Sequence, residues 1–171
     1  MKNLSNKIKT HDVHRNEYEA DIEKLNISIH VYGIAIKDGK ILISPQFNGY
    51  DFPGGTAELG ETHIETLIRE FKEETGCLVE PVELLNVYTS FFHHIKRNKD
   101  YQSYMIYYLV NVLDDNISSN GFDDDEKEYA EIARWIDIEE LKNMKYSSSI
   151  NVASELIEKA LKCLNNRSER N

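Results

Sequence analysis

Apolar and polar positions alternate most clearly in the segment that begins at residue 27. Residues 27–36 carry several β-branched side chains and predict a β-strand. Asp38 and Gly39 follow it and favour a tight turn, because a sequence of this type tolerates the left-handed backbone that short hairpins need. Residues 40–44 then predict the returning strand, and residues 45–50 predict a loop.

Two longer apolar segments follow in the middle of the chain. Residues 79–94 and 101–113 both predict strands, and the second segment is unusually rich in tyrosine. The short basic segment 96–100 separates them. We therefore expect these two strands to pair in antiparallel fashion through a charged turn.

The C-terminal region combines a short strand with a helix. Residues 131–136 predict the strand, and a helical turn is expected near Ile138. Residues 147–164 predict an amphipathic helix, and residues 165–171 a frayed tail. The apolar side of that helix is formed by Ile150, Ala153, Ile157, Ala160, Leu161 and Leu164.

Residues 1–26 are polar and charged, and they predict an N-terminal extension with a short helix near residues 17–24. Residues 27–164 predict a single domain. Because strands occur before, between and after the helices, the expected fold class is α/β (α+β), with a mixed β-sheet sandwiched by helices.

Another amphipathic helix is predicted just after residue 62. Thr62 and Glu65 have the spacing of a capping box, and Gly76 suits the left-handed position that ends a helix. The apolar face between these ends consists of Ile64, Leu67, Ile68 and Phe71. These signals predict a helix with well-defined ends and one buried side.

This helix also carries a group of acids. Glu70, Glu73 and Glu74 follow Arg69, and a helix places these three carboxylates within a sector of roughly 100°. Like charges this close destabilise a helix, so a bound cation is a plausible reason for their presence. Oxygen ligands favour Mg²⁺ or Mn²⁺, which commonly act on phosphates. The alternative is a solvated acidic surface.

Composition narrows the range of partners. The 171-residue chain has a formal net charge of −10, which argues against broad nucleic-acid binding and against an anionic membrane surface. A phosphate substrate remains compatible, because a bound divalent ion reverses the local charge. Cys77 and Cys163 form no C-x-x-C pair, and the sequence shows no signal peptide and no membrane-length apolar segment. We expect a cytoplasmic protein, and a homodimer is left open.

The segment from residue 55 to residue 77 resembles a known family motif. It matches G-x5-E-x7-R-E-U-x-E-E-x-G-U, where U is a bulky apolar residue, and this pattern is the Nudix box of the Nudix hydrolases. The matching residues are Gly55, Glu61, Arg69, Glu70, Phe71, Glu73, Glu74, Gly76 and Cys77. Phe71 and Cys77 stand where aliphatic residues are commoner, a difference that affects packing more than chemistry. The resemblance implies the Nudix fold, an α/β/α sandwich.

The resemblance also implies roles for individual residues. Glu70, Glu73 and Glu74 would hold the metal, and Glu70 is also a candidate base. The backbone carbonyl of Gly54 would be a further ligand. Glu61 would support the site as a base or as a ligand through water.

Three further roles complete the expected site. Arg69 would organise the neighbouring carboxylates through its planar guanidinium. Glu128 is the first choice for an additional metal ligand from outside the box, and Glu131 is the alternative. Tyr50 and Phe52, which lead into the box, are candidates for stacking on the substrate.

The implied function is hydrolysis. Nudix enzymes use a divalent metal, Mg²⁺ or Mn²⁺, to cleave the pyrophosphate linkage of a nucleoside diphosphate joined to another moiety, with water attacking phosphorus. The alternative is a Nudix-fold sensor that binds a nucleotide without cleaving it. Such proteins typically lose box glutamates, whereas this chain keeps all of them. The sequence does not identify the nucleotide.

Overall fold

The structure is a computed structural model that describes residues 6–46, 49–114, 117–118, 132–146 and 152–169. Its elements in chain order are β1 (Lys7–His11), β2 (Glu17–Asp21), the 3₁₀ turn η1 (Ile22–Lys24), β3 (Asn26–Lys37), β4 (Lys40–Gln46), β5 (Gly49–Asp51), β6 (Gly54–Thr56), α1 (His63–Thr75), β7 (Leu78–His94), β8 (Lys99–Asp114), β9 (Arg134–Asp137), the 3₁₀ turn η3 (Glu140–Asn143) and α2 (Ala153–Ser168).

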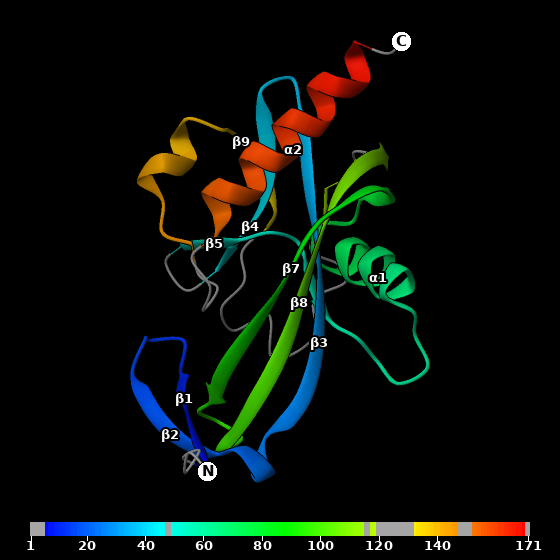
Figure 1. Cartoon of the computed structure of the whole chain (residues 1–171). Coiled ribbons are helices and arrows are strands. Elements are labelled where there is room, and N and C mark those ends of the chain that lie inside the picture. The colour runs from blue at the N-terminus through cyan, green and yellow to red at the C-terminus, as the bar shows by residue number, and fades with distance from the viewer. Residues whose placement is uncertain (1–5, 47–48, 115–116, 119–131, 147–151, 170–171) are drawn as a thin grey trace.

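A mixed β-sheet forms the centre of the molecule, in the order β2-β1-β7-β8-β3-β4-β5. β7 and β8 pair in antiparallel fashion, as predicted, and β8 runs parallel to β3. β6 pairs with β3, and β9 pairs with β4. The helices α1 and α2 lie on opposite sides of the long strands (Figure 1), which confirms the predicted sandwich of helices around a mixed sheet.

The alternation of side chains along β3 builds two apolar cores. Val31 and Ala35 pack in a cluster with Phe71 of α1, whereas Ile34 packs in a second cluster with Leu156 of α2. Successive strand residues point to opposite faces, so a single strand supplies both cores. Each helix is thereby held against its own side of the sheet.

Helix α1 has the predicted ends. The backbone N–H of Glu65 donates to the Thr62 hydroxyl at 3.3 Å, and the N–H of Thr62 donates to the Glu65 carboxylate at 2.8 Å. At the other end Gly76 has φ 78° and donates its N–H to the carbonyl of Lys72. Both signals act over a few residues, which is why the sequence alone revealed them.

The turn between β3 and β4 is as predicted. The second strand, β4, is longer than predicted. Asp38 and Gly39 both have positive φ, 51° and 74°. The expected loop at 45–50 is wrong at residues 45–46 and 49–50, which belong to the paired strands β4 and β5, whereas residues 47–48 lie outside the described residues. Pro45 lies within β4, and its neighbours Ser44 and Gln46 also pair with β5.

The N-terminal region contains a β-hairpin where a short helix was predicted at residues 17–24. β1 and β2 pair in antiparallel fashion, and only η1 is helical. Alternate side chains meet across the strands: Lys9 lies 2.7 Å from Glu17. The charges of this segment therefore support cross-strand pairs rather than a helical turn.

This hairpin extends the main sheet. His11 of β1 pairs with Phe92 of β7, and the Thr10 hydroxyl donates to Asp100 at 2.8 Å. The ring of Tyr18 stacks on His93 with a centroid distance of 4.0 Å. These contacts fasten residues 7–21 to the end of the β7–β8 ribbon, as Figure 1 shows at the N-terminus.

The C-terminal elements follow the predicted order with shifted ends. β9 begins at Arg134, later than the predicted strand, and η3 follows it. α2 begins at Ala153 within the described residues, and it continues through Ser168, past the predicted end at residue 164. Leu156, absent from the predicted apolar face, is fully buried. Neither α1 nor α2 is long and apolar enough to cross a membrane, and this holds for every helix in the described part of the chain.

Asp51 of β5 is one of the buried carboxyl groups of the structure. Asp51 is 5% exposed and accepts the Phe52 N–H at 2.8 Å. Burial raises its pKa to about 7, although the hydrogen bonds from Phe52 and Tyr146 oppose the shift. The folded protein therefore keeps a proton on Asp51 in a pH range where the unfolded chain has lost it.

The first prediction concerns the helix cap. Thr62→Ala removes the hydroxyl that accepts the Glu65 N–H, and it should lower the free energy of unfolding by about 1 kcal/mol. Thr62→Ser keeps the hydroxyl and serves as the matched control. Urea denaturation followed by circular dichroism measures both, and equal stability of Thr62→Ala and the unmodified protein would contradict the capping role.

The second prediction concerns pH. The raised pKa of Asp51 adds stability below the ordinary aspartate pKa, and this stability is lost as the pH rises toward 7. Asp51→Asn should therefore flatten the decline in the free energy of unfolding between pH 4 and pH 7. Urea denaturation at stepped pH values tests this, with the exposed Asp137→Asn as control. Parallel pH profiles for Asp51→Asn and the unmodified protein would show that Asp51 is not protonated in the folded state.

Candidate functional site

Arg69 lies at the centre of the acidic group on α1. Its Nε donates to Glu61 at 2.6 Å, and its Nη2 donates to the other oxygen of the same carboxylate at 2.8 Å. Its Nη1 lies 3.0 Å from an oxygen of Glu70 and 3.0 Å from an oxygen of Glu73. A single planar cation therefore draws three of the predicted acids together, with one of them held in a bidentate pair.

Glu61 is held by more than the arginine. It also accepts the backbone N–H of Glu58 and the hydroxyl of Thr66, both at 3.0 Å. The hydrogen bonds from Arg69 are the main reason that its pKa is lowered to about 2. A carboxylate of such low basicity is a poor general base near neutral pH, so the geometry favours a supporting role for Glu61.

Gly55 explains how Glu70 reaches the sheet. Glu70 is 8% exposed, and a Cβ added to Gly55 would lie 2.4 Å from its Oε2. Any larger residue at this position would displace the carboxylate. The first glycine of the motif therefore leaves room for the Glu70 carboxylate beside β6.

Gly54 has no room for a side chain on the side that faces β3. Its φ is 147°, and an added Cβ would lie 2.1 Å from the carbonyl oxygen of Val31 in β3. Its N–H donates to the carboxylate of Glu74 at 3.1 Å. The backbone of β6 thus sits between β3 and the glutamates of α1.

The structure brings together most of the residues predicted for the metal site. These are Gly54, Glu61, Arg69, Glu70, Glu73 and Glu74, whereas Glu128 and its alternative Glu131 lie outside the described residues. Four of these residues are carboxylates, and Arg69 pairs with three of them, Glu61, Glu70 and Glu73. Carboxylate and carbonyl oxygens are the donors that Mg²⁺ and Mn²⁺ prefer.

The carboxylates described here are not arranged to coordinate a metal ion. In the described part of the chain, no group of three or more histidine, cysteine, aspartate or glutamate side chains is placed to hold an ion. Arg69 engages Glu70 and Glu73, and Gly54 engages Glu74. The residues fit a hard cation by their chemistry, and binding one would require these side chains to turn from their present partners.

The two predicted stacking residues lie in the apolar core. Tyr50 is 3% exposed and Phe52 is fully buried, both packed near Tyr146. Burial in this cluster indicates a packing role. Their contact with a substrate stays a prediction.

Sequence reasoning missed Thr56, which contacts Arg69, and His30, which contacts Thr56 in turn. The carbonyl of Thr56 accepts a hydrogen bond from Arg69 Nη2 at 3.1 Å, and the Thr56 hydroxyl lies 3.2 Å from His30 Nδ1. His30 is far from the motif in sequence and reaches it because β3 pairs with β6. The alternation of side chains on β3 was the available signal, but it did not show which strand would lie beside it.

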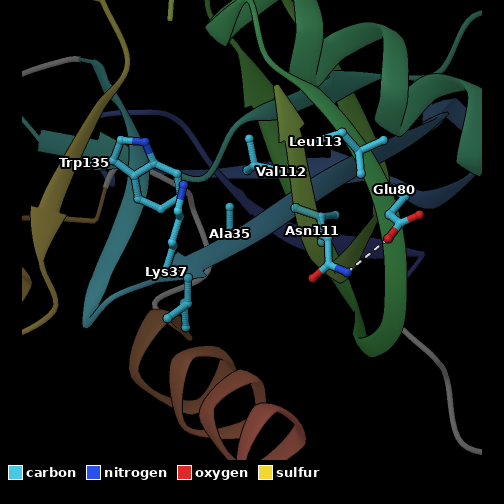
Figure 2. Close-up of a pocket in the computed structure, with 9 residues that line it drawn as sticks. Ala35, Lys37, Glu80, Asn111, Val112, Leu113 and Trp135 are labelled. Carbon is cyan, nitrogen blue, oxygen red and sulfur yellow. Dashed lines mark hydrogen bonds between the residues drawn. The ribbon is translucent and has the colours of Figure 1, made fainter. Parts of the chain in front are cut away.

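A cavity of about 320 Å³ lies elsewhere, between the ends of β3, β7, β8 and β9. Figure 2 shows its labelled lining, with the Trp135 ring on one side and Asn111 bonded to Glu80 on the other. The complete lining is Ala35, Ile36, Lys37, Glu80, Val110, Asn111, Val112, Leu113 and Trp135. None of the residues predicted for the site lines this cavity.

Comparisons with known proteins agree with the motif and the fold. An ADP-ribose pyrophosphatase of Methanocaldococcus jannaschii is 40% identical over 79 residues, which cover 41% of this chain and 47% of the relative. A MutT-like protein of Streptomyces ambofaciens is 44% identical over 64 residues, which cover 36% of this chain and 42% of the relative. The aligned parts therefore span less than half the length of these two proteins.

A solved structure described as a NUDIX hydrolase from Nitrosomonas europaea superposes with a TM-score of 0.57. The match covers 78% of this chain and 88% of that chain at 21% identity, and it supports the fold. The family model of the NUDIX domain matches residues 26–156, most of the sequence. The chain therefore belongs to the NUDIX domain family.

Proposed function

We propose that this protein is a metal-dependent hydrolase that cleaves the pyrophosphate linkage of a nucleoside diphosphate joined to another moiety. Membership of the NUDIX family supports this reaction class. The observation that carries the proposal is the group of glutamates gathered around Arg69 next to the backbone of Gly54 and Gly55. A group of acids this dense has a clear use in holding a cation against phosphates.

The proposed metal ligands are Glu70, Glu73, Glu74 and the carbonyl of Gly54, with Glu128 as an additional ligand. A bound Mg²⁺ or Mn²⁺ would neutralise phosphate charge and lower the pKa of bound water. The side chain of Glu73 is 43% exposed, against 11% for Glu70. Glu73 can therefore turn toward an ion with less disturbance of packing than Glu70.

Arg69, Glu61 and Glu70 have further roles in the proposed reaction. Arg69 fixes the orientation of Glu61 through two hydrogen bonds and keeps it ionised. Glu70 is the proposed base, because its carboxylate is confined beside Gly55 in β6. Abstraction of a proton from water by Glu70 would leave a protonated Glu70 and a hydroxide that attacks phosphorus, while the bridging P–O bond breaks and its electron pair leaves with the departing phosphate group.

The alternative from another class is a nucleotide sensor without hydrolysis, and the intact set of glutamates favours the hydrolase. A relative described as an ADP-ribose pyrophosphatase makes ADP-ribose the first substrate to test. The cytoplasmic location and the homodimer stay predictions.

The third prediction concerns metal binding. Millimolar Mg²⁺ or Mn²⁺ should raise the melting temperature, because an ion that binds only the folded state stabilises it. Glu73→Gln should remove most of this rise, since it deletes one charged ligand. Differential scanning fluorimetry across a metal titration measures the effect.

Glu83→Gln is the matched control, because Glu83 lies exposed on β7 outside the acidic group. It should respond to metal as the unmodified protein does. A melting temperature that stays constant across the titration would count against a metal site in this group.

The fourth prediction concerns hydrolysis. The unmodified protein should hydrolyse at least one of ADP-ribose, nucleotide sugars, dinucleoside polyphosphates or nucleoside triphosphates in the presence of Mg²⁺ or Mn²⁺. Glu70→Gln should lower kcat by about 100-fold or more, the range expected when a general base is lost. Separation of products by ion-exchange chromatography measures the rate. Tight binding of one of these nucleotides without cleavage would instead support the sensor.

A further inference from the structure

The cavity of Figure 2 lies where the central sheet divides. β3 and β8 pair as far as Ala35 and Val110, and beyond that pair β3 continues beside β4 whereas β8 continues beside β7. The gap between the two strands opens into the cavity of about 320 Å³. This volume is at the low end of the range for small-molecule sites, so it suits a ligand of mononucleotide size.

This cavity is separate from the acidic group. Gly55, which lies beside Glu70, pairs with Val31 of β3. Ala35 is the first cavity residue along β3, and it lies about 13 Å further along the strand at about 3.3 Å per residue. Val31 and Ala35 both belong to the apolar cluster that packs under α1. That cluster therefore fills the space between the two sites.

One wall of the cavity carries an aromatic ring and a cation. Trp135 stands on β9, and the side chain of Lys37 points toward its ring in Figure 2. Lys40 is the cross-strand neighbour of Lys37 in the β3–β4 hairpin, and Asp137 is the neighbour of Lys40 on β9. The indole offers a flat apolar surface for another ring, and the Lys37 ammonium adds a positive charge beside it.

The opposite wall carries an amide that is held by a carboxylate. Asn111 donates through its Nδ2 to Glu80 Oε1 at 3.1 Å. A primary amide has two N–H donors and a carbonyl oxygen, so this bond leaves one N–H and the Oδ1 of Asn111 for a ligand. Ala35 and Val112 supply apolar lining between the two walls (Figure 2). The cavity thus combines a stacking surface, a paired donor and acceptor, and a cation.

These groups match an adenine nucleotide. The amide donor and acceptor of an asparagine are complementary to N7 and the N6 amino group of adenine. In guanine the corresponding atoms, N7 and O6, are both acceptors, so the Oδ1 of Asn111 would face another acceptor. A purine ring placed between Trp135 and Asn111 would direct an attached phosphate toward the positive charge of Lys37.

We propose that this cavity is a second nucleotide site, which binds an adenine nucleoside monophosphate with its ring on Trp135, its N6 and N7 edge on Asn111 and its phosphate at Lys37. Glu80 is a positioning residue that orients the Asn111 amide. The site is independent of the proposed hydrolysis, because its lining shares no residue with the acidic group around Arg69.

The fifth prediction uses the single tryptophan of the chain as a reporter of the cavity. AMP added to the unmodified protein in EDTA should change the fluorescence of Trp135 in a saturable way, because a base stacked on the indole alters its emission. GMP should bind about 10-fold more weakly than AMP, as expected when one bidentate base contact is lost. Titration of Trp135 fluorescence with each nucleotide measures the Kd.

Two variants test the individual contacts. Asn111→Leu should weaken AMP binding about 10-fold and abolish the preference over GMP. Lys37→Gln should weaken AMP binding about 10-fold, as expected for a lost bond to a charged group, and change adenosine binding less than about 2-fold. Arg134→Gln is the matched control, because Arg134 is an exposed cation next to Trp135 on β9 and points to the other face of the strand. It should bind AMP as the unmodified protein does.

The role of Glu80 is tested by rescue. Glu80→Ala removes the acceptor that orients Asn111, so it should reduce the preference for AMP over GMP. Glu80→Gln keeps a carbonyl oxygen and should restore that preference. Melting curves of all the variants check that each is folded.

The outcomes are distinct. No change of fluorescence at millimolar AMP, equal affinity for AMP and GMP, or undiminished AMP binding in both Asn111→Leu and Lys37→Gln would overturn the inference. Weakening of AMP binding by Arg134→Gln as large as that by Lys37→Gln would also overturn it. Absence of hydrolysis by the unmodified protein would contradict the proposed function alone, because AMP binding is measured in EDTA.

Discussion

The site depends on the contact between one guanidinium and several carboxylates. Without Arg69, the glutamates of α1 and the preceding loop would repel one another on a helix that packs tightly against the sheet. Arg69 holds Glu61 in a bidentate pair and also engages Glu70 and Glu73. The remaining negative charge is what makes the group attractive to a dication. In the account proposed here, the arginine keeps the acids assembled until an ion takes over part of its role.

The position of the contact between Arg69 and the glutamates depends on how closely α1 approaches the sheet. Gly54 and Gly55 allow the backbone of β6 to lie between β3 and α1, where any Cβ would collide with Val31 or Glu70. The capping box and Gly76 fix the two ends of α1. The glycines and the caps therefore determine where the carboxylates stand, and the apolar face of α1 holds them there through Phe71 and its core.

Local signals in the sequence predicted α1 and the long strands. They did not show which segments far apart in the sequence pair with one another. The capping box acts within four residues, so Thr62 and Glu65 predicted the start of α1 correctly. The N-terminal hairpin was mistaken for a helix because it is held by pairing between β1 and β2 and by contacts with β7, far along the chain. His30 and Thr56 were missed for the same reason, since only the β3–β6 register makes them neighbours. The burial of Phe52 likewise depends on rings contributed by β8 and by Tyr146.

The most direct test of the account is the anomalous diffraction of a crystal of this protein soaked in MnCl₂. The account predicts a manganese peak about 2.0–2.2 Å from carboxylate oxygens of the α1 glutamates, with Glu70 and Glu73 turned away from Arg69 and the Arg69–Glu61 pair intact. A map at full soaking with no peak in this acidic group, and with the carboxylates still bound to Arg69, would contradict it.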